Sequence, residues 1–149
     1  MAVLLALMPV WAAAQDCPID QAAATRLLDE VNAERLQVGL IAVRPEAALT
    51  EAAQDHACDM LLHGYFDHRG RDGSSPKTRA EAAGYRACMI LENIAMGQRD
   101  PRGVIGDWMN SPGHRNNILN KDAEDAGIAI AREANRPPIY VMVLASPCR

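Results

Sequence analysis

Apolar residues recur at helical spacing in the first part of the chain, which predicts two amphipathic helices. The first is expected over residues 20–37 and is ended by Gly39. The second is expected to start near Thr50, a suitable N-cap, and to end at Gly64. The two apolar stripes consist of Ala24, Leu27, Leu28 and Val31, and of Ala53, Ala57, Met60 and Leu61.

Two dipeptides of a capping residue followed by proline mark further helix starts. Ser75-Pro76 predicts a short helix that closes at Gly84, and Asp100-Pro101 predicts another. The latter carries Trp108 on its apolar side and is expected to bury it. Proline and glycine at residues 112–113 should break that helix, and residues 114–119 can form one more short helical turn.

Strand patterns are few and come late. Three candidates cover residues 88–91, 127–131 and 139–144. The last is apolar on both alternating faces, so both sides of its sheet should be covered. The short connection between the last two segments suits an antiparallel hairpin. The fold class expected is therefore α+β, a three-layer α-β-α sandwich with a small antiparallel sheet.

Length and composition indicate one exported domain. The chain has 149 residues, about half of them apolar, and residues 1–14 read as a signal peptide, because an uncharged apolar run ends in three alanines. A single domain is expected over residues 16–149, secreted or periplasmic, monomeric and without a transmembrane segment. The formal charge is −4 and the basic residues are dispersed, which argues against nucleic-acid binding through a basic face.

Four cysteines fit an oxidising compartment: Cys17, Cys58, Cys88 and Cys148. Three pairings are formally possible. Because chain termini often lie close together, the favoured pairing joins Cys17 to Cys148 and Cys58 to Cys88. Buried thiols are the alternative, and zinc ligation is less favoured because no C-x-x-C pair exists.

Two histidines and one acid come from three separate motifs. His68 ends GYFDH at residues 64–68, ahead of DGSSP at 72–76; Glu92 begins ENIA at 92–95; and His114 lies in DWMNSPGHR at 107–115. Such a set could bind a divalent cation such as zinc with an open position for water, or could perform acid–base chemistry. Alternatively, the three side chains hydrogen-bond one another and only hold the segments together.

Together these motifs resemble the bacterial, SCP-like extracellular branch of the CAP superfamily, which also contains cysteine-rich secretory proteins, antigen 5 and pathogenesis-related proteins. The resemblance covers most of residues 24–148 in order. It implies an α-β-α sandwich, secretion, and a central cleft that contains His68, Glu92 and His114. Recurring ligands in this superfamily are sterols, other lipids and divalent metals, so the resemblance implies a cleft that binds one of these.

One position departs from the family pattern. Many eukaryotic members carry a second glutamate where this chain has Ser111, and Asp107, one helical turn earlier, is the possible substitute. Two other functions stay open. One is a metal-assisted extracellular hydrolase of protease, peptidoglycan or nuclease type, with His68, Glu92 and His114 as candidate catalytic residues. The other is an envelope interaction module with an inert cleft.

Two further histidines share one helical face. His56 and His63 are seven residues apart, with Asp59 between them, so a helical metal clip is conceivable. A core or solvated role is favoured for both, and a cationic His63 would suit the C-terminal turn of its helix.

Overall fold

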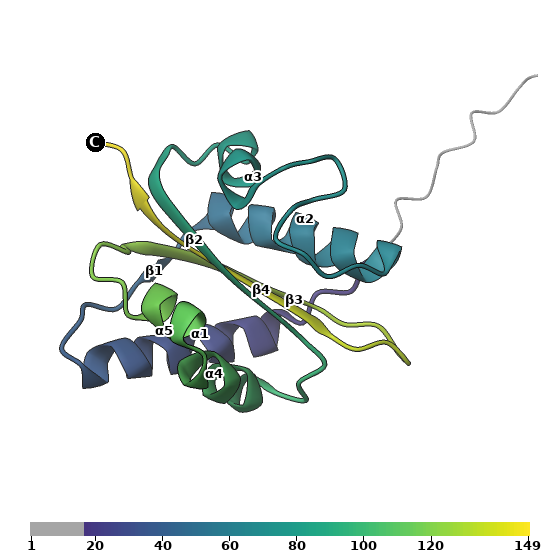
Figure 1. Cartoon of the computed structure of the whole chain (residues 1–149), viewed down its shortest axis with the longest axis horizontal. Coiled ribbons are helices and arrows are strands. Elements are labelled where there is room, and N and C mark those ends of the chain that lie inside the picture. The colour runs from purple at the N-terminus through teal and green to yellow at the C-terminus, as the bar shows by residue number, and fades with distance from the viewer. Residues whose placement is uncertain (1–16) are drawn as a thin grey trace, which may run out of the picture.

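The computed structural model describes residues 17–149, in which one sheet lies between two layers of helices (Figure 1). This confirms the predicted three-layer α-β-α sandwich. The helices are α1 (Gln21–Gln37), α2 (Ala47–His63), α3 (Pro76–Ala82), α4 (Pro101–Asn110) and α5 (Pro112–Ile118). The strands are β1 (Arg44–Pro45), β2 (Ala87–Met96), β3 (Asp125–Ala131) and β4 (Ile139–Pro147).

The sheet has the order β1-β3-β4-β2. Strand β4 pairs antiparallel with β3, as the predicted hairpin requires, and also with β2. Strand β1 pairs with β3 in parallel, so the sheet is mixed rather than purely antiparallel as predicted. With only two residues, β1 is too short to show the alternation from which a strand is predicted.

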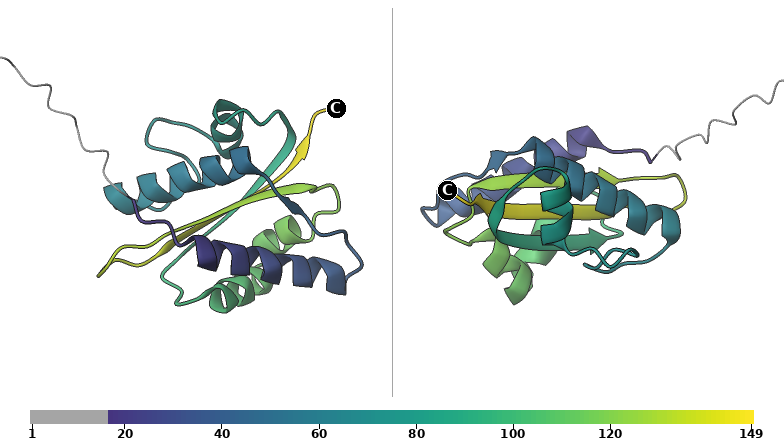
Figure 2. Two further views of the ribbon diagram at one scale, coloured as in Figure 1. Left: turned by 180° about the vertical axis from the view of Figure 1, so that it is seen from behind. Right: turned by 90° about the horizontal axis from the view of Figure 1, so that it is seen from above.

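Strand β4 is buried on both faces, as its sequence predicts. Tyr140 and Met142 belong to an apolar cluster with α1 and α4, while Val141 and Val143 belong to a second cluster with α2. Helices α1 and α2 accordingly lie on opposite sides of the sheet (Figure 2). Trp108 is 1% exposed within the first cluster, which confirms its predicted core position.

Helix α2 lies close against β3 at its first turn. A Cβ atom at Gly127 would come within 2.1 Å of the carbonyl carbon of Leu49, so only glycine permits this approach. The predicted N-cap Thr50 is wrong, because Glu46 caps the helix and Thr50 donates its hydroxyl to the Glu46 carbonyl inside the first turn. The helix ends at Gly64, as predicted, with a φ of 67°.

The helix starts marked by proline are confirmed. The Ser75 hydroxyl accepts the Thr78 amide proton at the start of α3, and the Asp100 carboxylate accepts that of Gly103 at the start of α4. Helix α5 begins at Pro112, two residues earlier than predicted. Pro112 cannot continue α4, and its fixed φ is already suited to the first turn of α5.

Strand β2 continues to Met96, well beyond its predicted end at residue 91. The apolar pattern ends before Glu92, and a charged residue is rare in a buried strand, so the predicted strand ended at residue 91. Pairing with β4 carries the strand on, with Glu92 opposite Val143 and Ile94 opposite Val141. As a result Glu92 sits on a rigid strand rather than in a loop.

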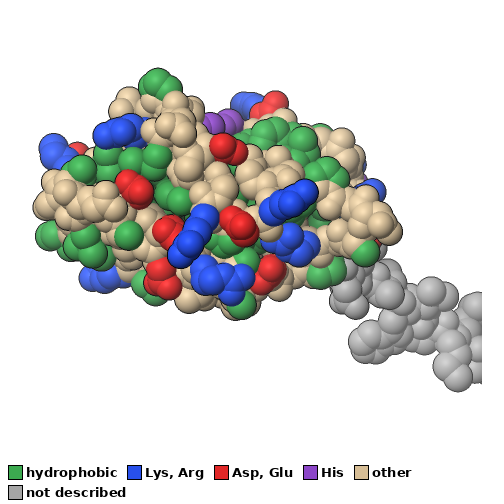
Figure 3. All heavy atoms as spheres, turned by 90° about the horizontal axis from the view of Figure 1, so that it is seen from below, with side chains coloured by type: hydrophobic (Ala, Val, Ile, Leu, Met, Phe, Trp, Pro, Cys, Tyr) green, Lys and Arg blue, Asp and Glu red, His purple; other side chains and the backbone are tan. Residues whose placement is uncertain are grey.

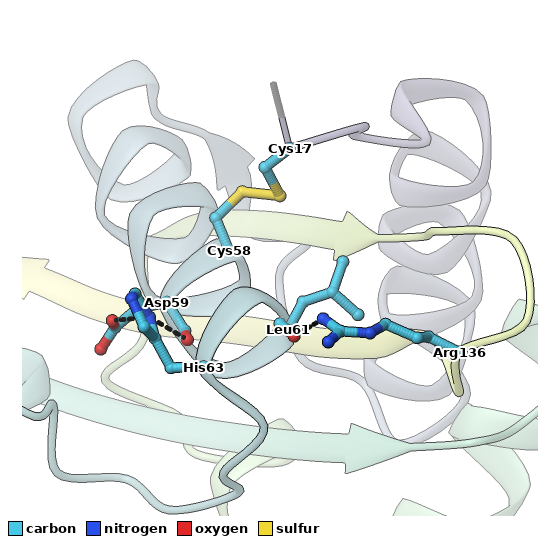
Figure 4. The surroundings of a disulfide bond; sticks show 6 residues. All are labelled: Cys17, Cys58, Asp59, Leu61, His63 and Arg136. Atoms are coloured by element: carbon cyan, nitrogen blue, oxygen red, sulfur yellow. Dashed lines mark hydrogen bonds and ion pairs between the residues drawn. A yellow bond between two sulfur atoms is a disulfide. The ribbon is translucent and has the colours of Figure 1, made fainter. Parts of the chain in front are cut away.

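The disulfides join Cys17 to Cys58 (Figure 4) and Cys88 to Cys148, with Cα–Cα distances of 5.7 and 4.7 Å. The predicted pairing of Cys17 with Cys148 is therefore wrong. Ile19 bridges to Ala131 near the β3–β4 connection, whereas Cys148 follows the opposite end of β4. A strand of that length separates the two cysteines by roughly 25 Å, and a disulfide needs Cα atoms within about 7 Å.

The predicted signal peptide, residues 1–14, lies outside the described residues. Within residues 17–149, no helix combines the length and the apolar character needed to cross a bilayer. The face covered by α1 and α4 carries acidic and basic side chains interspersed (Figure 3). A one-sign basic surface is therefore not found on that face, in line with the dispersed charges of the sequence.

Candidate functional site

The three predicted site residues come from three different elements. His68 lies in the loop between α2 and α3, Glu92 lies in the middle of β2, and His114 is the third residue of α5. A loop, a strand and a helix thus each supply one of the three side chains.

Glu92 is the buried centre of a polar network. Its side chain is 2% exposed, and each carboxylate oxygen accepts a hydrogen bond. His68 Nδ1 donates to Oε1 at 2.8 Å, and Arg79 Nη2 donates to Oε2 at 2.7 Å. Charge-assisted bonds of this length are strong, and here they compensate the burial of the carboxylate.

Arg79 is a site residue that sequence analysis missed. From α3 its Nη1 also donates to the main-chain carbonyls of His68 and Ser74, at 3.1 and 3.2 Å. One guanidinium therefore fixes both the loop that carries His68 and the acid to which His68 is bonded. The signal available in the sequence was the Ser75-Pro76 helix start, which orients Arg79 one turn later.

His68 is oriented with one nitrogen inward and one outward. Its Nδ1–H is used by Glu92, so Nε2 is the nitrogen left for another partner, on a side chain that is 52% exposed. The hydrogen bond to Glu92 raises the pKa of His68, against the opposing effect of burial. This imidazole is consequently a stronger base than a free histidine.

His114 has the opposite electrostatic setting. Burial lowers its pKa, and the positive charge of His68 lowers it further, so the two imidazoles lie within electrostatic range. The His114 ring packs beside Trp108 with 6.3 Å between ring centroids. The pair therefore combines a more basic and a less basic imidazole at one site.

Two asparagines fasten α5 to β2. The Asn93 amide donates to the His114 carbonyl at 3.1 Å, and the Asn117 amide donates to Asn93 Oδ1 at 2.8 Å and to the Glu92 carbonyl at 3.3 Å. Asn93 lies within the ENIA motif and Asn117 lies two residues after the DWMNSPGHR motif, and the sequence predicted a role for neither. Their hydrogen bonds fix the position of α5, and so of His114, relative to Glu92 on β2.

His56 is buried, in line with the core or solvated role favoured from the sequence, but its contact with the loop that carries His68 was not predicted. It is 1% exposed, and its Nε2–H donates to the Asp67 carbonyl at 2.9 Å, next to His68. Burial lowers its pKa, which favours the neutral ring. Its Nε2 lies 3.9 Å from Glu92 Oε1, so the contact is polar rather than an ion pair. His56 thus supports the loop that carries His68.

His63 belongs to a separate cluster, which excludes a metal clip with the buried His56. His63 Nδ1 lies 2.8 Å from Asp59 Oδ1 on the exposed end of α2 (Figure 4). The Tyr65 hydroxyl donates to the same carboxylate, and Arg71 lies 3.7 Å from it. Burial raises the pKa of Tyr65, and the hydrogen bond to Asp59, which stabilises the neutral phenol, raises it further.

The proposed second acid, Asp107, lies on the exposed side of α4. Gln98 donates a hydrogen bond to its carboxylate at 2.8 Å. Across residues 17–149, no hydrogen bond or ion pair connects Asp107 with His68, Glu92 or His114. The same described part of the chain holds no group of three or more His, Cys, Asp or Glu side chains arranged to bind a metal ion. The site therefore offers two imidazoles, with one carboxylate behind them.

The chain belongs to the CAP family. Residues 28–144 match the family model described as "CAP: Cysteine-rich secretory protein family". This confirms the family resemblance drawn from the three motifs.

Two relatives come from Bacillus subtilis (strain 168). An uncharacterized protein, YkwD, is 36% identical over 103 residues, which is 69% of this chain and 40% of YkwD. An uncharacterized membrane protein, YlbC, is 32% identical over 108 residues, which is 72% of this chain and 31% of YlbC. The chain thus spans less than half the length of either relative.

Solved structures share the fold. An outer surface protein from Borrelia burgdorferi has a TM-score of 0.83 at 18% identity, over 89% of this chain and all of that one. An extracellular protein containing an SCP domain from Bacillus anthracis has a TM-score of 0.75 at 22% identity, over 83% of this chain and 40% of that one. These likenesses support the α-β-α architecture. They carry no information about a ligand of this chain, which has to be inferred from the residues of the site.

Proposed function

We propose that this protein is an exported CAP domain whose cleft binds a divalent cation, such as zinc, through His68 and His114. The observation that carries the proposal is the 2.8 Å bond from His68 Nδ1 to Glu92. Metal-ligating histidines commonly donate their second ring N–H to a carboxylate, which sets the tautomer and makes the free nitrogen a better ligand.

The donor set fits such an ion. Imidazole nitrogen suits zinc, and the lowered pKa of His114 keeps its ring neutral and able to ligate. Two protein ligands leave coordination positions for water or for an exogenous ligand. When bound, the ion would act as a Lewis acid toward such a ligand. Glu92 and Arg79 would hold His68 in place, and Asn93 and Asn117 would hold α5.

Export is supported by independent features. Both disulfides of the described residues require an oxidising compartment, and two structural neighbours are named as an outer surface and an extracellular protein. The apolar sequence at residues 1–14 adds the signal-peptide prediction. We expect a secreted or periplasmic monomer, which size-exclusion chromatography of the exported protein would test.

The hydrolase alternative has less support from the geometry. A general base must be reachable by water, but the Glu92 side chain is only 2% exposed and is bonded to both His68 and Arg79. Chelator-sensitive cleavage in a screen of peptide, peptidoglycan and nucleic-acid substrates, abolished in Glu92→Gln, would favour hydrolysis over simple binding.

A lipid ligand is favoured by a different feature beside the cleft. A pocket of about 320 Å³ lies between the end of α2 and the β3–β4 connection, where Phe66 and Met96 are exposed to 42% and 46%. Arg136 borders it and donates to the Leu61 carbonyl (Figure 4). An acyl chain or sterol would fit its apolar lining, and a lipid panel against Phe66→Ser would test this candidate.

Zinc titration calorimetry tests the main proposal. Wild type should bind with measurable heat, and both His68→Gln and His114→Gln should lose it. His63→Gln is the matched control, because His63 Nδ1 also lies 2.8 Å from a carboxylate oxygen but belongs to another cluster. Equal heats in all four proteins, or negligible heats in all four, would overturn the metal proposal. If all four heats are negligible, the interaction-module alternative can be tested by capturing partners from envelope extracts. Partners that the variant His68→Gln/His114→Gln still retains would favour that alternative.

A further inference from the structure

Arg79 also lines a second pocket, which is larger than the one beside Phe66. It has a volume of about 580 Å³ and lies between α2 and the segment of residues 71–83. Helix α2 contributes Glu51, Asp55 and Asp59, and the opposite wall contributes Arg71, Asp72 and Thr78. Neither His68 nor His114 lines this pocket, so it is distinct from the proposed metal site.

The wall formed by α2 carries a stripe of three acids, two of which are uncompensated. Glu51, Asp55 and Asp59 follow one another at intervals of four residues, which places like charges on one helical face. Asp59 is compensated by His63, Tyr65 and Arg71. Among the described residues, Glu51 and Asp55 have no side-chain hydrogen bond or ion pair. Both side chains are exposed, and like charges at this spacing repel one another, so a cation bound between them would be favourable.

The floor of the pocket contains a buried acceptor with no partner. His56 lines the pocket, is 1% exposed, and has an Nδ1 that makes no hydrogen bond in the described structure. Its Nε2–H faces Asp67 and Glu92, neither of which lines the pocket, so the ring meets the pocket with its other edge. With the proton on Nε2, the Nδ1 lone pair is an acceptor that lacks a donor.

The two arginines of the pocket do not supply the missing donors. Arg79 is occupied by Glu92 and by the carbonyls of His68 and Ser74. Arg71 lies beside Asp59 at 3.7 Å. Along α2 the unused hydrogen-bonding capacity is thus all of one kind: the carboxylates of Glu51 and Asp55 and the imidazole lone pair of His56.

We propose that this pocket binds a small ligand through a protonated primary amine. An ammonium group has one positive charge, three N–H donors and no acceptor, and so matches two carboxylates and a neutral imidazole nitrogen. Alkylamines, lysine-like side chains and the α-amino groups of amino acids or peptides share this chemistry. The two alanines at residues 82–83, which also line the pocket, offer apolar contact to the rest of the ligand.

Nuclear magnetic resonance titration of the disulfide-bonded protein tests the proposal. We expect n-butylammonium or glycinamide, or both, to shift the ring nitrogen resonances of His56 in a saturable way. The comparison of these two probes distinguishes an alkylamine site from an α-amino site. Tetramethylammonium carries the same charge but has no N–H donor, so it should produce no saturable shift.

Charge-removing variants locate the site. Glu51→Gln/Asp55→Asn should weaken binding of the amine by about tenfold or more, as loss of charge-assisted hydrogen bonds implies. Asp29→Asn/Glu34→Gln removes the same charge from α1, across the sheet, and should bind as wild type does. The proposal is overturned if neither primary amine shifts His56, if tetramethylammonium acts equally, or if both double variants weaken binding alike. Zinc binding at His68 and His114 stays measurable in each case, so the two proposals fail separately.

Discussion

Arg35 and Glu92 are both buried charged residues, but they differ in what satisfies them. The Arg35 guanidinium donates to four main-chain carbonyls, those of Ile41, Ile118, Asn120 and Ala123. Glu92 accepts from two side chains, one of which, His68, is half-exposed. The Arg35 network is closed and joins three segments of backbone. The Glu92 network ends in an imidazole nitrogen that faces outward.

This difference separates a structural charge from a functional one. Main-chain acceptors are set by the fold and offer nothing to a ligand, whereas a carboxylate bonded to an exposed histidine tunes a group that a ligand can reach. Each network also lies in a different part of the sandwich. Arg35 holds α1 to the end of α5, and Glu92 holds β2 to the α2–α3 side.

Replacing Arg35 should have the largest effect on stability. Arg35→Met leaves four main-chain carbonyls without their donor, and the hydrogen bonds to Ile118 and Ala123 are buried. We expect a loss of about 3–5 kcal/mol in the free energy of unfolding. Arg26→Met, on an exposed position of the same helix, is the control. Urea unfolding measures both. Zinc binding by the folded fraction should not change. Weaker zinc binding in Arg35→Met would contradict the view that the Arg35 and Glu92 networks are independent.

Removing a disulfide should cause the second-largest loss in the free energy of unfolding. The loss should be concentrated in the part of the molecule that contains Glu92. Cys17–Cys58 fastens α2 and Cys88–Cys148 fastens the start of β2. Replacing Cys88 and Cys148 by serine should cost about 2–4 kcal/mol. Hydrogen exchange should rise first in β2 rather than around Arg35. Uniform exchange across the molecule would mean that the two regions unfold as one unit.

Neutralising Glu92 should be less costly but should change the chemistry. Glu92→Gln leaves Arg79 without its charged partner, and we expect a loss of about 1–3 kcal/mol. The pKa of His68 should fall toward its ordinary value, and zinc binding should weaken. Asp107→Asn is the matched control. Titration of the His68 imidazole by nuclear magnetic resonance measures its pKa in each variant. If the pKa of His68 also falls in Asp107→Asn, Asp107 is again a candidate for the second acid.

The smallest expected effect is a pH dependence from His56. Burial lowers its pKa, so the unfolded chain binds a proton that the folded chain does not, and stability should fall as pH drops below about 6.5. The raised pKa of His68 acts in the opposite direction, since its contribution is present below about 6.5 and is lost at higher pH. His56→Phe should flatten the acid limb measured by urea unfolding. An unchanged limb would mean that His56 binds its proton equally well in the folded and the unfolded chain.

The sequence predicted the elements whose signals are local. Capping residues followed by proline located α3 and α4, Gly64 located the end of α2, and the doubly apolar pattern of residues 139–144 predicted cover on both faces of the sheet. These predictions succeeded because helix capping, positive φ and alternation depend on residues within a few positions of one another. The three motifs also identified His68, Glu92 and His114 as candidates.

Tertiary structure decided what depends on residues far apart in the chain. The pairing of Cys17 with Cys58, the continuation of β2 through Glu92, and the roles of Arg79 and His56 all arise from contacts between separate elements. No local pattern encodes such contacts, because a buried polar side chain is stable only when partners from elsewhere in the fold satisfy it. The sequence by itself determined which side chains were available for the site, and packing of the two helical layers on the sheet decided which of them meet.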